Sequence, residues 1–133
     1  MSLIKASILN LIYKSLKIII SSSEPPKLLP LTFGADVMDE GGFAQVSCIV
    51  TKGDEPLTIS WFFHGSTITS DLGIITAPIG HRGSMLIIGS VAHKHRGNYT
   101  CSAKNEAAIV TNTVELKVNG TNCQYNRKTL DHF

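Results

Sequence analysis

Apolar and polar residues alternate with a period of two along most of the chain between residues 28 and 118. This is the pattern of β-strands that bury one face, and clusters of Gly, Pro, Asp and Asn separate the runs as turns do. We therefore predict an all-β domain. The predicted strands are residues 29–33, 44–50, 57–63, 73–79, 84–88 and 98–104, and a last strand that contains Val114, Leu116 and Val118.

Two cysteines and two aromatic residues narrow the prediction. Cys48 and Cys101 have the inward parity of their strands, Trp61 lies on the strand after Cys48, and Tyr99 stands two residues before Cys101. A disulfide between two sheets with a tryptophan packed on it is typical of the immunoglobulin sandwich. We predict an immunoglobulin-like two-sheet sandwich with one inter-sheet disulfide, Cys48–Cys101, and with Trp61, Tyr99 and Leu86 in its core.

The spacing of the strands further limits the type of sandwich. Roughly 20 residues separate the turn at His64 from the strand at 84–88, too few for the extra strand pair of a variable-type domain. This favours the I-set arrangement. Within each predicted strand we expect one parity to face the core. These residues are Ala44, Val46, Cys48, Val50, Leu57, Ile59, Trp61, Phe63, Leu86, Ile88, Tyr99, Cys101 and Ala103.

The chain has room for one such domain, at residues 25–120, between two flanks. Lysines interrupt the apolar residues of segment 1–24, which makes a membrane-spanning helix an unfavourable interpretation. A weak signal peptide or readthrough beyond the module are alternatives, and we favour a helix-prone or disordered flank without function. Residues 121–133 show no alternation and are expected to be a disordered tail.

Composition and cysteine number indicate a compartment and exclude some partners. Pairing Cys48 with Cys101 leaves Cys123 free or intermolecular. A structural disulfide persists outside the reducing cytosol, so we expect a secreted protein or one on the extracellular side of the plasma membrane. The net charge is +2, with both signs interspersed. We expect no nucleic acid partner and no membrane contact by this domain itself.

Candidate chemistry is sparse. The sequence has no nucleophile elbow, phosphate-binding loop or zinc-protease motif, so we expect no enzyme and no cofactor. His93 and His95 are two residues apart, but they fall in a predicted turn without a third ligand, and we expect solvated side chains and no metal. Asn98-Tyr-Thr100 and Asn119-Gly-Thr121 fit N-x-[ST], which makes Asn98 and Asn119 candidate N-glycosylation sites.

The outward residues of two neighbouring strands suggest an interaction surface. The predicted outer side of strands 44–50 and 84–88 carries apolar residues, whereas the opposite sheet presents mostly polar ones. An exposed apolar stripe commonly marks a contact surface. Two alternatives remain, that the flanks fold over the stripe or that strand 84–88 is out of phase by one residue. The interface candidates are Phe43, Gln45, Ser47, Ile49, Met85 and Ile87.

Four segments carry information beyond the strand pattern. They are PPKLLPLTFG, GGFAQVSCIVTKGDEPLTISWF, HKHRGNYTC and KNEAA. These segments resemble the arthropod Down syndrome cell adhesion molecule (Dscam) family, in particular its alternatively spliced variable immunoglobulin domains. The resemblance implies a cell-adhesion receptor with self-recognition in neurons, as in axon guidance, or immune recognition. Two residues depart from the family pattern. His95 replaces an acid, and Ala108 stands where glycine is common, which costs stability if the backbone there is left-handed.

Our preferred hypothesis is a non-enzymatic adhesion module that pairs weakly and homophilically with an identical module on another chain. The resemblance also implies further immunoglobulin or fibronectin domains in a longer ectodomain. The alternative is a soluble immune pattern-recognition domain that binds microbial surfaces through the same stripe.

Overall fold

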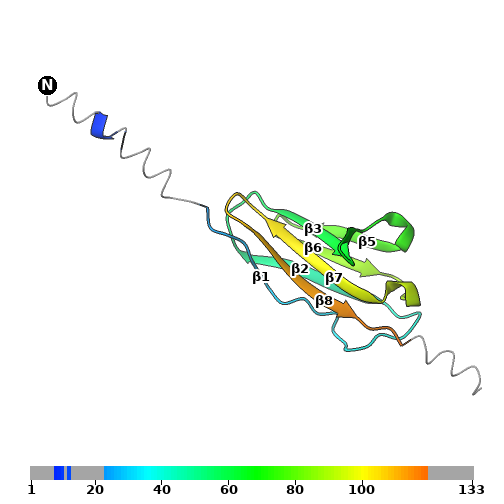
Figure 1. Cartoon of the computed structure of the whole chain (residues 1–133). Coiled ribbons are helices and arrows are strands. Elements are labelled where there is room, and N and C mark those ends of the chain that lie inside the picture. The colour runs from blue at the N-terminus through cyan, green and yellow to red at the C-terminus, as the bar shows by residue number, and fades with distance from the viewer. Residues whose placement is uncertain (1–7, 11, 13–22, 120–133) are drawn as a thin grey trace, which may run out of the picture.

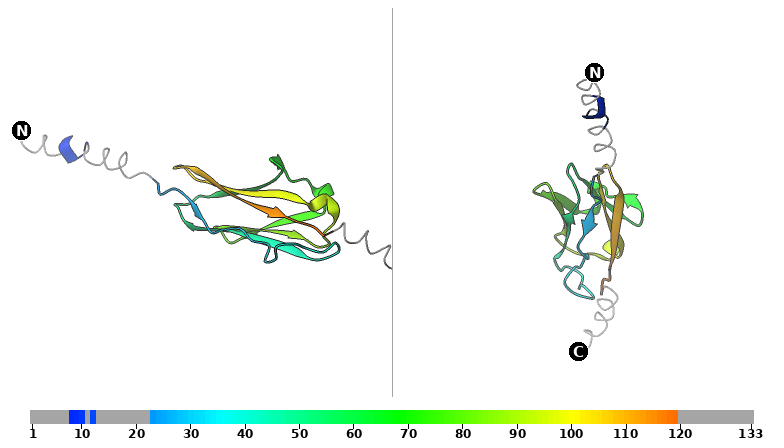
Figure 2. Two further views of the ribbon diagram at one scale, coloured as in Figure 1. Left: turned by 60° about the horizontal axis from the view of Figure 1, so that its bottom comes forward. Right: turned by 90° about the vertical axis from the view of Figure 1, so that its left-hand side faces the viewer.

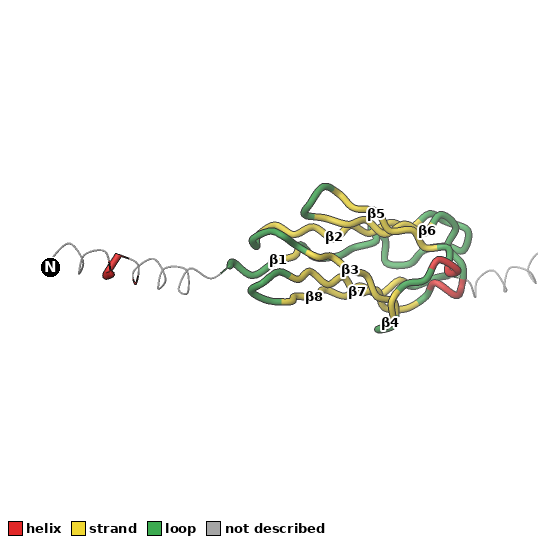
Figure 3. Tube along the Cα trace, turned by 90° about the horizontal axis from the view of Figure 1, so that it is seen from above, coloured by secondary structure: helices red, strands yellow, loops and turns green. Residues whose placement is uncertain are grey.

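Two antiparallel sheets face each other across one core in the computed structural model, which describes residues 8–10, 12 and 23–119 (Figures 1 and 3). One sheet has the strand order β1-β2-β6-β5 and the other β4-β3-β7-β8. The strands are β1 (Lys27–Leu28), β2 (Ala44–Lys52), β3 (Thr58–Phe63), β4 (Ser66–Thr67), β5 (Ile74–Ile79), β6 (Gly83–Ile88), β7 (Gly97–Lys104) and β8 (Ile109–Leu116). Two 3₁₀ helices, η1 (Ser70–Leu72) and η2 (His93–His95), lie in the connections.

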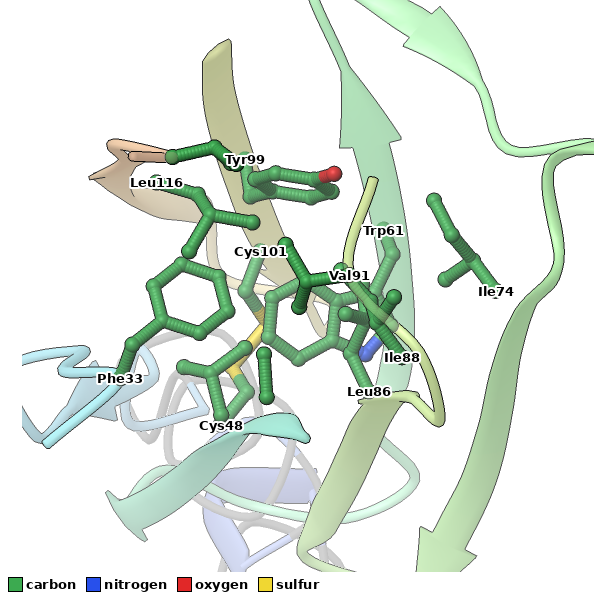
Figure 4. Packing of buried hydrophobic residues seen from close by; sticks show 13 residues of the cluster. Phe33, Cys48, Trp61, Ile74, Leu86, Ile88, Val91, Tyr99, Cys101 and Leu116 are labelled. Atoms are coloured by element: carbon green, nitrogen blue, oxygen red, sulfur yellow. A yellow bond between two sulfur atoms is a disulfide. The ribbon is translucent and has the colours of Figure 1, made fainter. Parts of the chain in front are cut away.

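The predicted disulfide joins the sheets at their central strands. Cys48 of β2 and Cys101 of β7 are bonded, with their Cα atoms 6.4 Å apart. Trp61 of β3 lies directly opposite Cys101 in the pairing of β3 with β7, and its side chain lies beside the disulfide (Figure 4). The indole Nε1 donates a hydrogen bond to Ser84 Oγ, 2.9 Å away on the opposite sheet. The predicted immunoglobulin sandwich is therefore confirmed.

The predicted parity of the central strands is also confirmed. Alternate residues of β2 are buried, from Ala44 to Val50, and Leu86 and Ile88 of β6 are fully buried. Strand β6 is thus in phase, and the alternative that it is shifted by one residue is wrong. Strand β3 is less completely buried on its inward side. Trp61 is buried, whereas Ile59 and Phe63 of β3 and Leu57 just before it are half-buried.

The first strand was predicted in the wrong place. The structure has β1 at Lys27–Leu28, paired with the end of β2, instead of a strand at 29–33. Leu29 N–H still donates to Ile49 O, but Pro30 has no N–H to continue the ladder. The chain then leaves this sheet, and Phe33 packs edge-on against Tyr99 in the core, with ring centroids 5.6 Å apart.

The connection from β3 to β5 holds the short strand β4, which the sequence pattern did not predict. Its two residues pair with the end of β3. Ser66 and Thr67 are both exposed, so this strand has no apolar alternation that could reveal it. Because only one short strand is added, the sheet lacks the strand pair of a variable-type domain.

His95 is buried, contrary to the expectation of a solvated turn residue. Its side chain is 2% exposed, whereas His93 is exposed as predicted. Nε2 lies 2.7 Å from Leu72 O, and Nδ1 accepts the Ala92 N–H at 2.8 Å. A carbonyl can only accept, so Nε2 carries the proton and the ring is neutral. The His95 side chain therefore ties η2 to η1.

Tyr99 completes this end of the core. Its hydroxyl donates to His95 O at 2.6 Å, and its ring stacks on Phe63 with centroids 4.6 Å apart. The side chain is fully buried, and this burial raises the pKa of the phenol well above its ordinary value of about 10. The folded state therefore retains the phenolic proton at alkaline pH more strongly than the unfolded state does.

The opposite end of the sandwich is closed by Asn105. Its side-chain nitrogen donates to Glu24 O and Asp54 O, and its oxygen accepts the N–H groups of Ala107 and Ala108. Glu24, predicted to lie in the flank, is thus bonded to the domain. Ala108 does not have the left-handed backbone that would make it costly, because its φ is not positive.

The two ends of the described domain lie far apart. The segment before β1 enters at one end of the long axis, and the chain leaves β8 at the other (Figures 1 and 2). Beyond β8, two backbone hydrogen bonds hold the chain to Met38. The Met38 N–H donates to Lys117 O, and the Asn119 N–H donates to Met38 O. The tail predicted at 121–133 lies outside the described residues, as does nearly all of the flank 1–24.

We predict that His95→Ala lowers the free energy of unfolding by about 2–4 kcal/mol, because two backbone groups lose their partner and a cavity remains. Urea denaturation of the oxidised chain measures this change. His93→Ala is the matched control on the same 3₁₀ helix and should change stability by at most about 0.5 kcal/mol. Equal effects of the two variants would contradict the structural role of His95.

A second prediction concerns alkaline pH. The raised pKa of Tyr99 contributes stability that is fully present below about pH 10 and is lost as pH rises toward the folded-state value. One such group steepens the fall in unfolding free energy by at most about 1.4 kcal/mol per pH unit. Denaturation between pH 9 and pH 11 should therefore show a steeper fall in the wild type than in Tyr99→Phe. Parallel curves would exclude this contribution.

Candidate interaction surface

The outward residues of three adjacent strands form one largely apolar surface. The registers of β2 with β6 and of β6 with β5 place these residues in three rows across the sheet. We call this surface the outer apolar face. Its rows are Gln45–Ile87–Ile75, Ser47–Met85–Ala77 and Ile49–Gly83–Ile79, and Phe43 lies at its margin just before β2.

Exposure varies across the outer apolar face. Ile75 is 61% exposed, Phe43 58% and Ile79 37%, whereas Ile49, Met85 and Ile87 are half-buried by their neighbours. The apolar stripe predicted from the sequence is present, but its most exposed aliphatic side chain was missed. Because Ile74 faces the core, the alternation in the predicted strand 73–79 already places Ile75, Ala77 and Ile79 outward.

Gly83 makes the third row continuous. A Cβ at this position would lie 2.9 Å from Ile49 Cδ1 and 3.2 Å from Ile79 Cβ, closer than ordinary contacts. The two isoleucines can therefore extend over the bare backbone of β6 from either side. Because Gly83 has no side chain, the outward apolar residues of β2 and β5 form a single apolar surface.

The outer face of the other sheet is polar. Strands β7 and β8 run side by side, and the Thr100 and Thr113 hydroxyls share a hydrogen bond of 2.7 Å. We call this surface the outer polar face. Its residues are Thr58, Ser60, Phe62, Asn98, Thr100, Ser102, Lys104, Ile109, Thr111, Thr113 and Glu115, of which Phe62 and Ile109 are the apolar ones.

The described residues hold no cluster of side chains suited to a metal ion. Within residues 23–119, no three His, Cys, Asp or Glu side chains gather as a metal site requires. Hollows of about 360 and 410 Å³ between β3 and β5 share Ile59, Thr76 and Ser84 as lining residues. The Ser84 hydroxyl already accepts the indole N–H of Trp61 and contacts Ala77 O. No helix among these residues has the length and apolarity to span a bilayer.

The two glycosylation candidates occupy different positions. Asn98 is exposed on the outer polar face near the start of β7. Asn119 is half-buried at the end of the described domain, where its side-chain nitrogen donates to Asp39 Oδ1 at 3.2 Å. A glycan on Asn98 would therefore lie on a face of the sandwich, whereas one on Asn119 would lie at its end.

Residues 25–105 match the family model of immunoglobulin domains. This match covers more than half of the chain, so the chain belongs to the immunoglobulin domain family. Within that family it is similar to the Dscam cell adhesion molecules, which confirms the resemblance described above. It is 38% identical to the cell adhesion molecule Dscam1 of Drosophila melanogaster over 96 residues, which are 71% of this chain and 5% of Dscam1.

Solved structures agree with this assignment. The Dscam1 Ig7 domain, isoform 5, superposes with a TM-score of 0.70 and 39% identity, over 74% of this chain and 99% of that domain. The N-terminal eight Ig domains of Down syndrome cell adhesion molecule isoform 1.30.30 give a TM-score of 0.66 and 40% identity, over 70% of this chain and 12% of that one. This chain therefore corresponds to one module of much longer relatives.

Proposed function

We propose that this domain is a cell-adhesion module that lies outside the cell and pairs with an identical module through the outer apolar face. The observation that carries the proposal is the continuous surface over β2, β6 and β5, with Ile75 61% exposed. Exposed apolar surfaces of this kind commonly mark protein contacts. The names of the relatives, cell adhesion molecules, support the same function.

The order of the three rows suits pairing around a two-fold axis. Such an interface must complement itself, so that residue i meets residue j of the partner and j meets i. The row of Met85 lies in the middle and carries the small residues Ser47 and Ala77. A two-fold axis that runs along the row of Met85 would place the row of Ile75 against the partner's row of Ile79. Ile75 would then meet the partner's Ile79 at one edge of the face, and Gln45 would meet the partner's Ile49 at the other.

The size of the face favours weak pairing. Three strands spaced about 4.8 Å apart, over about six residues of about 3.4 Å each, give a sheet area on the order of 300 Å². Stable interfaces bury roughly 800 Å² on each partner. A single module should therefore bind weakly, and several modules in one ectodomain would supply the remaining affinity through avidity.

The positions of the two ends support neighbouring domains. Entry and exit at opposite ends of the long axis suit a chain of modules, such as further immunoglobulin or fibronectin domains. In that arrangement neighbours would contact the ends of the sandwich and leave its two outer faces free. The outer apolar face could then meet a second chain from the side.

A matched pair of isoleucines tests the proposal. Ile75 and Ile109 are 61% and 60% exposed on opposite faces of the sandwich. We expect Ile75→Lys to weaken self-association by at least about tenfold, because a two-fold interface contains the change twice and each isoleucine contributes roughly 1–2 kcal/mol. Sedimentation equilibrium of the full chain, with Cys123→Ser to exclude an intermolecular disulfide, measures the dissociation constant.

Ile109→Lys should leave that constant unchanged, and thermal unfolding of both variants verifies that the fold is retained. A wild-type chain that stays monomeric at millimolar concentration would overturn homophilic pairing. If both substitutions weaken pairing equally, the contact does not lie on the outer apolar face. A monomer that instead adheres to bacterial surfaces would support the pattern-recognition alternative.

A further inference from the structure

A modification site lies on the face opposite to the proposed interface. Asn98 and Thr100 have the same parity on β7, so both point outward, while Tyr99 between them is fully buried in the core. We propose that Asn98 carries an N-linked glycan that covers the outer polar face and leaves the outer apolar face open for pairing. The relation of the glycan to pairing rests on the proposed function, whereas the presence of the glycan does not.

The chemistry requires a lipid-diphosphate oligosaccharide, the donor of the secretory pathway. The side-chain nitrogen of Asn98 forms a bond to the anomeric carbon of the first N-acetylglucosamine. The bond from that carbon to the diphosphate oxygen breaks, the lipid diphosphate leaves with the electron pair, and the nitrogen loses one proton. The N-x-[ST] sequence supplies the acceptor, and Tyr99 as the middle residue meets its one restriction, which is against proline.

The surroundings of Asn98 suit a solvated sugar. Its side chain is exposed, and its cross-strand neighbour on β8 is the exposed Glu115. Its carbonyl accepts the His64 N–H at 3.0 Å, so the backbone is held in the sheet while the side chain points to solvent. The next outward residues, Thr100 and Thr113, bond each other through their hydroxyl groups.

The position of this glycan has a consequence for pairing. Phe62 is the cross-strand neighbour of Thr100, so it lies diagonally from Asn98, within the range over which strand neighbours interact. A bulky, hydrated group there would hinder contacts through β3, β7 and β8. The outer apolar face, on the other sheet, would remain open.

Glycan occupancy is tested by mass. The full chain is secreted from animal cells behind a signal sequence, with Thr121→Ala to remove the Asn119 sequon and Cys123→Ser to prevent crosslinking. We expect the intact mass to include one glycan, which peptide N-glycosidase removes while converting Asn98 to aspartate. Asn98→Gln and Thr100→Ala should lack this glycan, and Thr100→Ser should retain it. A secreted chain without a glycan on Asn98 would overturn the proposal.

The effect on pairing is tested with the same material. Because Asn98 is remote from the proposed interface, wild type and Asn98→Gln should dimerise with constants that agree within about twofold. Gln45→Asn makes a new sequon with Val46 and Ser47 in the outer apolar face. The glycosylated fraction of this variant should pair at least about tenfold more weakly than its unglycosylated fraction.

The outcomes separate the two proposals. If the wild type pairs only after its glycan is removed, the glycan lies in the interface, and the proposed shielding of the opposite face is wrong. If the two fractions of Gln45→Asn pair equally, the outer apolar face is not the interface, while occupancy at Asn98 still stands by mass. If Asn98 is unoccupied and Gln45→Asn blocks pairing, the adhesion proposal stands without the glycan.

Discussion

The bond between Cys48 and Cys101 determines which residues of this domain face solvent. It joins the central strands of the two sheets, β2 and β7, so both cysteines must point into the core. Side chains alternate along a strand, and the bond therefore sets the parity of each sheet. In β2 it turns Gln45 and Ile49 outward, and in β7 it turns Asn98 outward. A shift of either strand by one residue would bury these side chains and expose the cysteines.

The two outer faces then differ because the residues at the outward positions differ. On β6 and β5 these positions hold Met85, Ile87 and Ile75, where a solvated sheet would ordinarily carry polar residues. On β7 and β8 they hold hydroxyl and charged side chains, and Asn98 belongs to a sequon. One core thus supports two surfaces of opposite character.

Local periodicity predicted the central strands but not the edges. The parity of β2 and β7 followed from alternation and from the positions of the two cysteines. The phase of β6 stayed open in the sequence, and the burial of Leu86 and Ile88 settles it. Three features did not show in the alternation. Pairing at the N-terminal edge stops at Pro30, and β4 is too short and polar to show a pattern. His95 is buried at a contact with a distant segment, where its Nε2 donates a hydrogen bond to Leu72 O, 23 residues away. A histidine in a turn shows the same sequence pattern whether another loop buries it or it is exposed to water.

The modest size of the outer apolar face is consistent with a soluble module. A larger exposed apolar surface would drive association without regard to partner, and solubility limits how far such a surface can grow. Here Gln45 and Ser47 interrupt it on β2, while Gly83 leaves space over β6 that Ile49 and Ile79 approach from either side. These polar and small residues restrict which surface can fit against it. In the proposed pairing, selectivity would depend on the shape and order of the three rows, and binding strength would depend on how many modules act together.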